Sequence, residues 1–505
     1  MADSAPPAIQ DEQQQDDNQL KDPSKIHFQT NYVRRIIIAS YWLVIFLGLP
    51  LWWKTTSIER LSLPHSRIKT LSDKSLRFSI GLHAADERLH VALDDAKFKE
   101  RLVSEGLNVR AVSKEEDSDY QILLYEGRDT YVQGRKVSFP DNVSEDTMLD
   151  TVASLLVPHA VDRRHEQHIV PFAPRFQLSF SLLNEDAADG TSLLSWPIRS
   201  NIRRHLESTL QDFAGLYNFT IESQVQFHAP LAFDPVPIGD NQPGDEQNVA
   251  ASDGKSDARE AGLTPEQLTV FVNSAEWSLS SSVSNDPVLH FLLFVPKRPL
   301  HILSESGEPS LSRAFLIPQW GGVVLADTDQ LNVDPAAAVD AAFATFRAQL
   351  ATLLGVPQLP AGVTAREPSG HTSPWQIDAL LRRRARESAQ EARDTLSSIS
   401  RLVDQIENMP VGVSVRDDVQ GALQALEVAY SSASDSLLGA FEHAAYATVL
   451  ASRAFFSPGM LQMLYFPPEH IYAVYMPLFA SALIPVLATA ARELRAWRRD
   501  TVAAA

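Results

Sequence analysis

The sequence predicts an α/β domain, with a mixed sheet and flanking helices, followed by a long helical hairpin and bracketed by two transmembrane helices. Three observations support this fold class. Two uncharged apolar runs, 36–53 and 471–491, lie near the two ends of the chain. Between them, residues up to 354 alternate between strand-like and helix-like patterns. After Ser373 only the helical spacing of apolar residues remains.

Both apolar runs are long enough to cross a membrane. As helices they would measure about 27 Å and 31 Å, close to the ~30 Å core of a bilayer. Cations cluster before the first run and after the second, and they are Arg34, Arg35, Arg492, Arg495, Arg498 and Arg499. The positive-inside rule therefore predicts cytosolic termini and a luminal middle segment. The first run starts too late, and ends in residues too bulky, for a cleaved signal peptide, so we expect a signal anchor.

The boundaries of the expected segments follow from shifts in composition. The alternating region, which allows two lobes that meet near Val170, comes before a Pro- and Gly-rich stretch. In order, we expect a disordered cytosolic tail (1–33), the first transmembrane helix (36–53), a luminal α/β domain (54–354) with a polar excursion (239–262), a linker (355–373), a long helical hairpin (374–457), a juxtamembrane segment (458–470), the second transmembrane helix (471–491) and a cytosolic tail (492–505).

Short apolar or alternating runs predict the strands, and helical periodicity predicts the helices. The expected strands are 78–81, 120–125, 176–183, 219–227, 289–295 and 323–326, and the expected helices are 94–105, 145–156, 197–214, 265–278 and 335–354. Thr264, Asp334 and Ser373 each stand before a proline, which predicts an N-cap followed by proline at the first helical position. Gln267 and Gln376 complete two capping boxes.

In the expected hairpin, apolar residues recur at helical spacing from Ile377 to Ile406. The sequence MPVG at 409–412 interrupts this pattern, and we expect a single second helix that continues through Val449. The first helix carries many charged residues, which we interpret as a solvated face rather than a binding surface. They are Arg382, Arg383, Arg384, Arg386, Glu387, Glu391 and Arg393.

Composition excludes several classes of function. The formal net charge of −19 argues against nucleic acid and anionic membrane surfaces as partners. The chain contains no cysteine, which excludes disulfides, thiolate metal sites and a cysteine nucleophile. Two N-glycosylation sequons, at Asn142 and Asn218, fall in the expected luminal part. Two such matches are close to chance, but they agree with the expected topology.

Few residues suggest catalytic or metal-binding chemistry. His165 and His168 are spaced i, i+3 rather than the i, i+4 of a metalloprotease helix, so we interpret them as part of a polar surface loop. Asp327 and Asp329 resemble the start of a calcium loop, but helix capping explains them equally well. No phosphate-binding loop, dinucleotide fingerprint or nucleophile elbow occurs, and we expect no cofactor.

Other features favour contact with partner proteins. Trp320 precedes two glycines in a segment that suits a tight turn, with a docking site as the alternative. The apolar, proline-broken stretch 455–468 suits either the membrane interface or a partner. Prolines within the second span remove main-chain donors, which favours a span packed among other helices. The candidate contact residues are Trp320, Tyr465, Phe466, Tyr472, Tyr475, Pro477 and Pro485.

Five blocks of sequence carry a family resemblance. They resemble segments of the PIG-S family, in the same order. The blocks are SYW with LGLPLWWKTT (40–56), FSLLN (180–184), NFTIESQV (218–225), FLIPQWGG (315–322) and LYFPPEHIYAVYMPLF (464–479). Proteins of that family are subunits of the glycosylphosphatidylinositol (GPI) transamidase. The acidic excursion after Gly239 matches nothing in this resemblance.

The resemblance implies an endoplasmic-reticulum membrane complex that cleaves a C-terminal signal and joins the new C-terminus to the ethanolamine phosphate of a GPI lipid. Its Cys–His dyad would lie on a caspase-like subunit, PIG-K, and the other implied partners are PIG-T, PIG-U, a GPAA-type subunit and membrane lipid. Since this chain has no cysteine, the resemblance implies a noncatalytic subunit. The alternatives are a membrane-tethered luminal hydrolase without a local motif and, third, a binding receptor.

Overall fold

The computed structural model describes residues 30–56, 59–158, 169–188, 192–238, 260–279, 285–366, 372–406, 409–460 and 468–503. They form two compact units. The first comprises the described residues within 1–64, 398–418 and 453–505, and the second comprises those within 65–397 and 419–452. The two units are described separately below.

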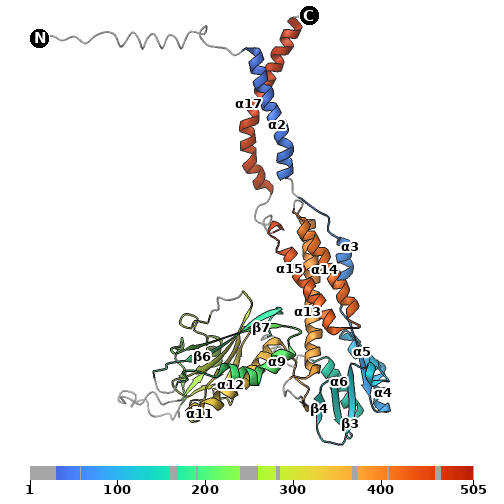
Figure 1. The fold of residues 1–505 in the computed structure, drawn as a ribbon, viewed down its shortest axis with the longest axis vertical. Coiled ribbons are helices and arrows are strands. Elements are labelled where there is room, and N and C mark those ends of the chain that lie inside the picture. Colours follow the sequence, from blue (N-terminus) through green and yellow to red (C-terminus); the bar gives the residue numbers. More distant parts are fainter. Residues whose placement is uncertain are drawn as a thin grey trace, which may run out of the picture. The chain divides into compact units, whose positions relative to one another are not determined.

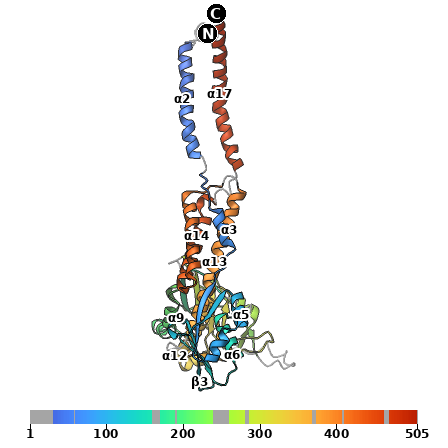
Figure 2. The same cartoon turned by 90° about the vertical axis from the view of Figure 1, so that its right-hand side faces the viewer.

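The first unit contains the two apolar helices, α2 (Asn31–Thr56) and α17 (Pro468–Ala503). Both are long and apolar enough to cross a membrane, and the chain buries neither apolar window. The two helices run alongside each other, so that the beginning of α2 and the end of α17 lie at the same end (Figures 1 and 2). There Glu493 accepts from Arg34 and Arg35 at 2.8 and 2.9 Å. α17 extends beyond the expected end of the span at 491.

In the second unit, the first sheet has six strands in the order β14-β4-β5-β3-β1-β2, and all its strand pairs are parallel except β4–β5. Its strands are β1 (Phe78–Ala84), β2 (Leu107–Ala111), β3 (Tyr120–Tyr125), β4 (Thr130–Gln133), β5 (Lys136–Pro140) and β14 (Val363–Ala365). The helices of this region are α3 (His65–Ser72), α4 (Glu87–Leu93), α5 (Ala96–Ser104), η2 (Glu115–Asp117) and α6 (Glu145–Leu156).

The second sheet has five strands in the order β12-β13-β10-β6-β7, parallel except for the β12–β13 hairpin. They are β6 (Arg175–Asn184), β7 (Asn218–Gln226), β10 (Val288–Val295), β12 (Ala314–Ile317) and β13 (Gly321–Leu325). The helices of this region are α8 (Ile198–Asn201), the π-turn η3 (Ile202–Leu206), α9 (Glu207–Asp212), α11 (Thr328–Val333) and α12 (Pro335–Leu354). A small third sheet, in the order β11-β9-β8, contains β8 (Val236–Pro237), β9 (Ala261–Leu263) and β11 (Leu300–Ile302), next to α10 (Pro265–Thr269).

The five-stranded sheet is covered on both faces. α9 and α12 cover one face (Figure 1). On that face Phe180 stacks with Phe291 and with Phe343 of α12 at ring-centroid distances of 5.2 and 5.6 Å. On the other face Phe271 and Trp277 pack against Phe294. Because both faces are covered, nine of the ten residues of β6 are buried, which is typical of a central parallel strand. One core cluster includes residues of both larger sheets.

Several expected elements agree closely with the structure, and α6, α12 and β3 have the expected bounds. The capping boxes at Thr264 and Ser373 both form. The expected helix 265–278 is wrong beyond Thr269. There Phe271 and Trp277 turn into the core, and the Trp277 indole N–H donates to the Pro230 carbonyl at 3.0 Å. These tertiary contacts override the helical pattern.

The expected single helix after the MPVG break is also wrong, because α13 (Pro374–Gln405) is followed by two helices, α14 (Val413–Ser432) and α15 (Leu437–Phe455). The separating sequence is rich in Ser and Asp, which favour turns and caps over helix interiors. Ser436 accepts from the N–H of Gly439 and so caps α15. Instead of a two-helix hairpin, three helices pack together, with Thr448 donating to the Ser388 carbonyl at 2.8 Å.

Two expected segment boundaries also change. The expected linker 355–373 contains β14, which pairs in parallel with β4. The polar excursion ends earlier than expected, since Ala261 and Gly262 belong to the buried strand β9. Residues 239–259 of that excursion lie outside the described residues, as does most of the expected disordered tail.

Candidate functional site

The residues singled out for catalysis do not assemble into a catalytic site in the described part of the chain. Asp327 caps α11 by accepting from the N–H groups of Asp329 and Gln330, and it pairs with Arg313 at 3.3 Å. Capping therefore accounts for this segment. No group of three or more metal-ligating side chains occurs among the described residues. His165 and His168 lie outside those residues.

Trp320 lies in the tight turn that joins β12 to β13, as expected for the glycines that follow it. Its ring stacks on His290 at a centroid distance of 4.5 Å. A Cβ at Gly321 would overlap the His290 carbonyl oxygen, and one at Gly322 would overlap the Gln349 side chain. The glycine pair therefore permits close packing of β13 against β10 and α12. Burial lowers the pKa of His290 to about 4, which keeps the stacked ring neutral near pH 7.

The first turns of α13 carry a buried polar network that reaches the six-stranded sheet. Asp378 accepts from the Tyr120 hydroxyl at 2.8 Å and pairs with Arg135 at 3.1 Å. Arg382 donates to the Tyr120 oxygen and to the carbonyl of Leu156, the last residue of α6, at 3.1 Å each. Burial raises the pKa of Tyr120 well above its ordinary value. Arg382 thus caps the carboxyl end of α6 with a charge of the favourable sign.

Arg384 makes the equivalent connection to the second sheet region. Its guanidinium donates to the carbonyls of Val170 and of Leu354, the last residue of α12, at 3.0 Å each. It also donates to the Tyr217 hydroxyl at 3.1 Å and to Glu387 at 2.8 Å. The Arg384 side chain is only 3% exposed. It therefore ties α13 to α12 and to the residues that flank β6 and β7.

This network corrects the expectation that the charged face of α13 is solvated. Arg382 and Arg384 are 2% and 3% exposed and donate to several main-chain carbonyls. Arg383, between them, points elsewhere and forms a half-exposed pair with Glu387. Consecutive charged residues on this helix therefore have different roles, and periodicity alone does not separate them.

Beside this network lies a cavity of about 440 Å³. Its charged lining includes Asp119, Arg135, Asp378 and Arg382. Asp119 accepts from the Gly81 N–H at 2.7 Å, and the other three belong to the network above. Each of these four groups forms at least one hydrogen bond within the protein, which supports a structural role for the cavity.

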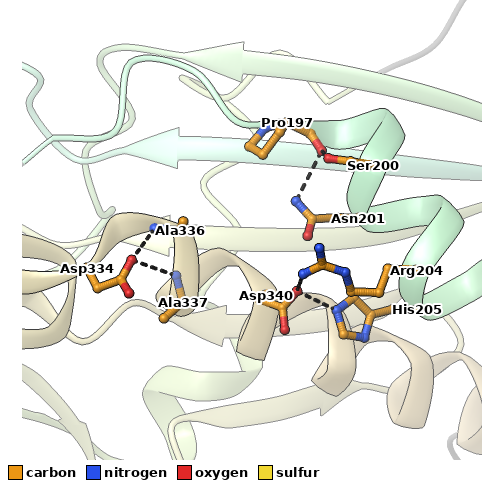
Figure 3. A network of polar contacts seen from close by, with 9 residues as sticks. All are labelled: Pro197, Ser200, Asn201, Arg204, His205, Asp334, Ala336, Ala337 and Asp340. Carbon is orange, nitrogen blue, oxygen red and sulfur yellow. Dashed lines mark hydrogen bonds and ion pairs between the residues drawn. The ribbon is translucent and has the colours of Figure 1, made fainter.

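A second hollow, a groove of about 620 Å³, separates the helical segment 198–212 from β7. Arg204 and His205, in the π-turn of that segment, both reach Asp340 of α12, at 2.7 and 2.8 Å (Figure 3). Since π-turns are rare and frequently occur at functional sites, this segment is the strongest candidate that the sequence patterns missed. The groove is lined by Arg199, Ile202, Arg203, Glu207, Leu210, Gln211, Ala214, Tyr217, Asn218, Phe219 and Ile221.

Both sequon asparagines are on the surface. Asn142 is exposed in the turn before α6, and Ser144 of its sequon caps that helix. Asn218 is exposed at the first position of β7, on the rim of the groove. Accessibility of this kind is compatible with glycosylation at either site.

The expected contact residues of the second span are only partly described. Tyr475, Pro477 and Pro485 lie on α17 and are exposed, and α17 continues as one helix through both prolines. Tyr472 belongs to the same helix. Tyr465 and Phe466 fall outside the described residues.

Comparison with known proteins gives a consistent result along most of the chain. The model of the family described as phosphatidylinositol-glycan biosynthesis class S protein (PIG-S) matches residues 39–124 and 107–500. The GPI-anchor transamidase component PIGS of Homo sapiens is 26% identical, over 94% of this chain and 98% of the human protein. The rat protein of the same name is 27% identical over 88% of this chain and 91% of its own length. The GPI transamidase component PIG-S homolog of Schizosaccharomyces pombe is 25% identical over 93% and 85%, respectively.

Proposed function

The chain belongs to the PIG-S family, and from this membership we propose that it acts as an accessory, noncatalytic membrane subunit of the GPI transamidase complex. The observation that carries the proposal is the extent of the family match. It begins within the first apolar helix, ends within the second, and includes the whole region between them. The function therefore belongs to the full two-helix architecture rather than to one transferable domain.

The absence of cysteine from the sequence supports the noncatalytic role. A thiolate nucleophile of the caspase type cannot be supplied by this chain. We propose that another, caspase-like subunit (PIG-K) provides it, and that PIG-T, PIG-U and a GPAA-type subunit complete the assembly. Purification of the full chain in mild detergent tests this directly, because a caspase-like partner should co-purify. Recovery of the chain without any such partner would contradict the proposal.

We propose that the protein resides in the endoplasmic-reticulum membrane with both termini in the cytosol and residues 54–470 in the lumen. The flanking arginines support this orientation through the positive-inside rule. The pairing of Arg34 and Arg35 with Glu493 supports one part of this topology, because it requires the start of α2 and the end of α17 to be on the same side of the membrane.

This topology predicts the outcome of protease protection. Protease added to sealed microsomes should remove only the terminal tails and leave the middle of the chain intact. If Asn142 and Asn218 are glycosylated, Asn142→Gln and Asn218→Gln should each remove one glycan-sized increment on a gel. Degradation of the middle segment in intact vesicles would contradict the topology.

The noncatalytic role predicts that no acidic or histidine side chain of this chain is essential for transamidation. Substitution of His165, His168, Asp327 or Asp329 by alanine should leave GPI attachment nearly unchanged where the complex assembles. Asp327→Ala should destabilise α11 by about 1 kcal/mol, the usual effect of losing an N-cap. GPI attachment is measured as the surface display of a reporter protein. A loss of about a hundredfold with normal assembly, typical of a missing acid or base, would instead favour an enzyme.

A further inference from the structure

The groove beside β7 lies at an open edge of the five-stranded sheet. β7 is the terminal strand, and its only strand partner among the described residues is β6. The N–H of Asn218 donates to the Pro174 carbonyl, next to β6. Since main-chain groups alternate in direction along a parallel strand, those of Phe219, Ile221 and Ser223 point away from β6. No described residue forms a main-chain hydrogen bond with them beyond the sheet.

The opposite wall of the groove is the helical segment 198–212. Its other face is held to α12 by the contacts of Arg204 and His205 with Asp340. Towards β7 it presents the apolar side chains of Ile202 and Leu210. A strand added to β7 would lie about 4.8 Å from it, within this groove. Its alternate side chains would face the helix, as those of an internal strand do.

The groove also carries a charge that the chain itself does not neutralise. Arg199 and Arg203 line it, and neither forms an ion pair with any residue that the structure describes. Among the described residues that line the groove, Glu207 is the one carboxylate. In a protein of net charge −19, two adjacent guanidinium groups without carboxylate partners favour an acidic ligand.

We propose that this groove binds an extended peptide strand of another subunit of the complex, with apolar residues at alternate positions and a carboxylate that pairs with Arg199 or Arg203. The strand adds to the edge of β7 through main-chain hydrogen bonds, and the apolar wall and the two arginines select its sequence. This inference rests on the proposed function, since it takes the partner from the transamidase.

A constant partner fits the groove better than a transient one. Long exposed strand edges promote unwanted association, and stable proteins cover or interrupt them. The exposed edge residue Ile221 is apolar and 39% accessible. A subunit strand would cover this edge permanently, whereas a passing substrate would leave it open between turnovers.

Site-specific photo-crosslinking in the intact complex tests the proposal. A photoreactive residue in place of Ile221, on the groove side of β7, should crosslink to an extended segment of another subunit, identified by mass spectrometry. The same residue in place of Thr220, the next position along the strand, faces the opposite side of the sheet and serves as the matched control. We expect the adduct at position 221 and not at 220.

Two variants test the energetic contribution of the same contact. Ile221→Pro removes one outward N–H while leaving the hydrogen bonds to β6 in place. Arg199→Glu with Arg203→Glu reverses the charge of the groove. Each variant should reduce co-purification of the subunit that crosslinking identifies by about tenfold or more. A loss of this size is expected when an interface charge or a strand contact is disrupted. The control is Arg88→Glu with Arg110→Glu, two exposed arginines outside the groove with the same change in charge.

The outcomes separate this inference from the proposed function. If the transamidase subunits co-purify but position 221 crosslinks only to proprotein, only to residues 239–259 of the same chain, or to nothing, strand addition is wrong and the proposed function stands. If no transamidase subunit co-purifies with the unmodified chain, both are wrong. An unchanged melting temperature of the variants shows that they are folded and that their recoveries can be compared.

Discussion

Replacing Arg384 by alanine is expected to lower the free energy of unfolding by about 3–5 kcal/mol, the range for removing one member of a buried charged network. Without the guanidinium, the carbonyls of Val170 and Leu354 and the hydroxyl of Tyr217 lose a buried donor. For a folded region of this size the melting temperature should fall by roughly 4–6 °C. The loss is measured by tryptophan fluorescence of the full chain in detergent during heating.

Arg383→Ala is the matched control, because Arg383 is adjacent and forms only the half-exposed pair with Glu387. Its effect should stay within about 0.5 kcal/mol. Arg384→Lys should fall between the two, since a single ammonium group cannot reproduce the planar fork that serves several acceptors. Equal melting temperatures for Arg384→Ala and Arg383→Ala would show that Arg384 does not tie α13 to its neighbours.

Replacing residues 471–491 by a polyleucine span is expected to keep the protein in the membrane but release it from its complex. Helices associate within a bilayer through close packing and satisfied polar groups, because lipid is as apolar as leucine. Pro477 and Pro485 each remove one main-chain donor from α17, which favours contact with neighbouring helices. Co-purification should fall about tenfold or more, which corresponds to at least ~1.4 kcal/mol. Resistance to alkaline extraction should remain.

A polyleucine span that retains Pro477 and Pro485 is the informative companion, since it separates the prolines from the side chains around them. Both versions keep Glu493, and with it the pairs to Arg34 and Arg35. The isolated 54–470 segment should fold and stay soluble, yet bind partners more weakly than the full chain. If the polyleucine chain co-purifies as well as the native one, the second span is only an anchor and attachment lies within residues 54–470.

Elements with strong local signals could be predicted from the sequence. The bounds of α12 follow from Asp334 and Pro335 at its start and Gly355, with φ of +80°, after its end. The Gly321–Gly322 pair was expected to mark a tight turn, and the structure shows that turn together with a close approach to β10 and α12. Elements whose limits depend on distant contacts could not be predicted. The helix after Pro265 ends early because Phe271 and Trp277 bury against Phe294, and β14 forms only where β4 is present to pair with it.

The candidate site shows the same division. The sequence alone does not distinguish Arg199 and Arg203 from other surface arginines. Their position beside an open sheet edge becomes evident only from the strand order, which makes β7 the terminal strand. The π-turn that contains Arg203 has no sequence signature, although the contacts of Arg204 and His205 with Asp340 accompany it.

By itself, then, the sequence determined the two apolar helices, the alternating α/β region, the lack of a cysteine nucleophile and the family. Each of these depends on composition, periodicity or a local motif, and such signals are present in the sequence whatever its tertiary contacts. Only the tertiary structure decided that Arg382 and Arg384 are buried while Arg383 is not. The physical reason is that a charge is stable inside a protein only where remote acceptors meet it, and here those acceptors are the carboxyl ends of α6 and α12.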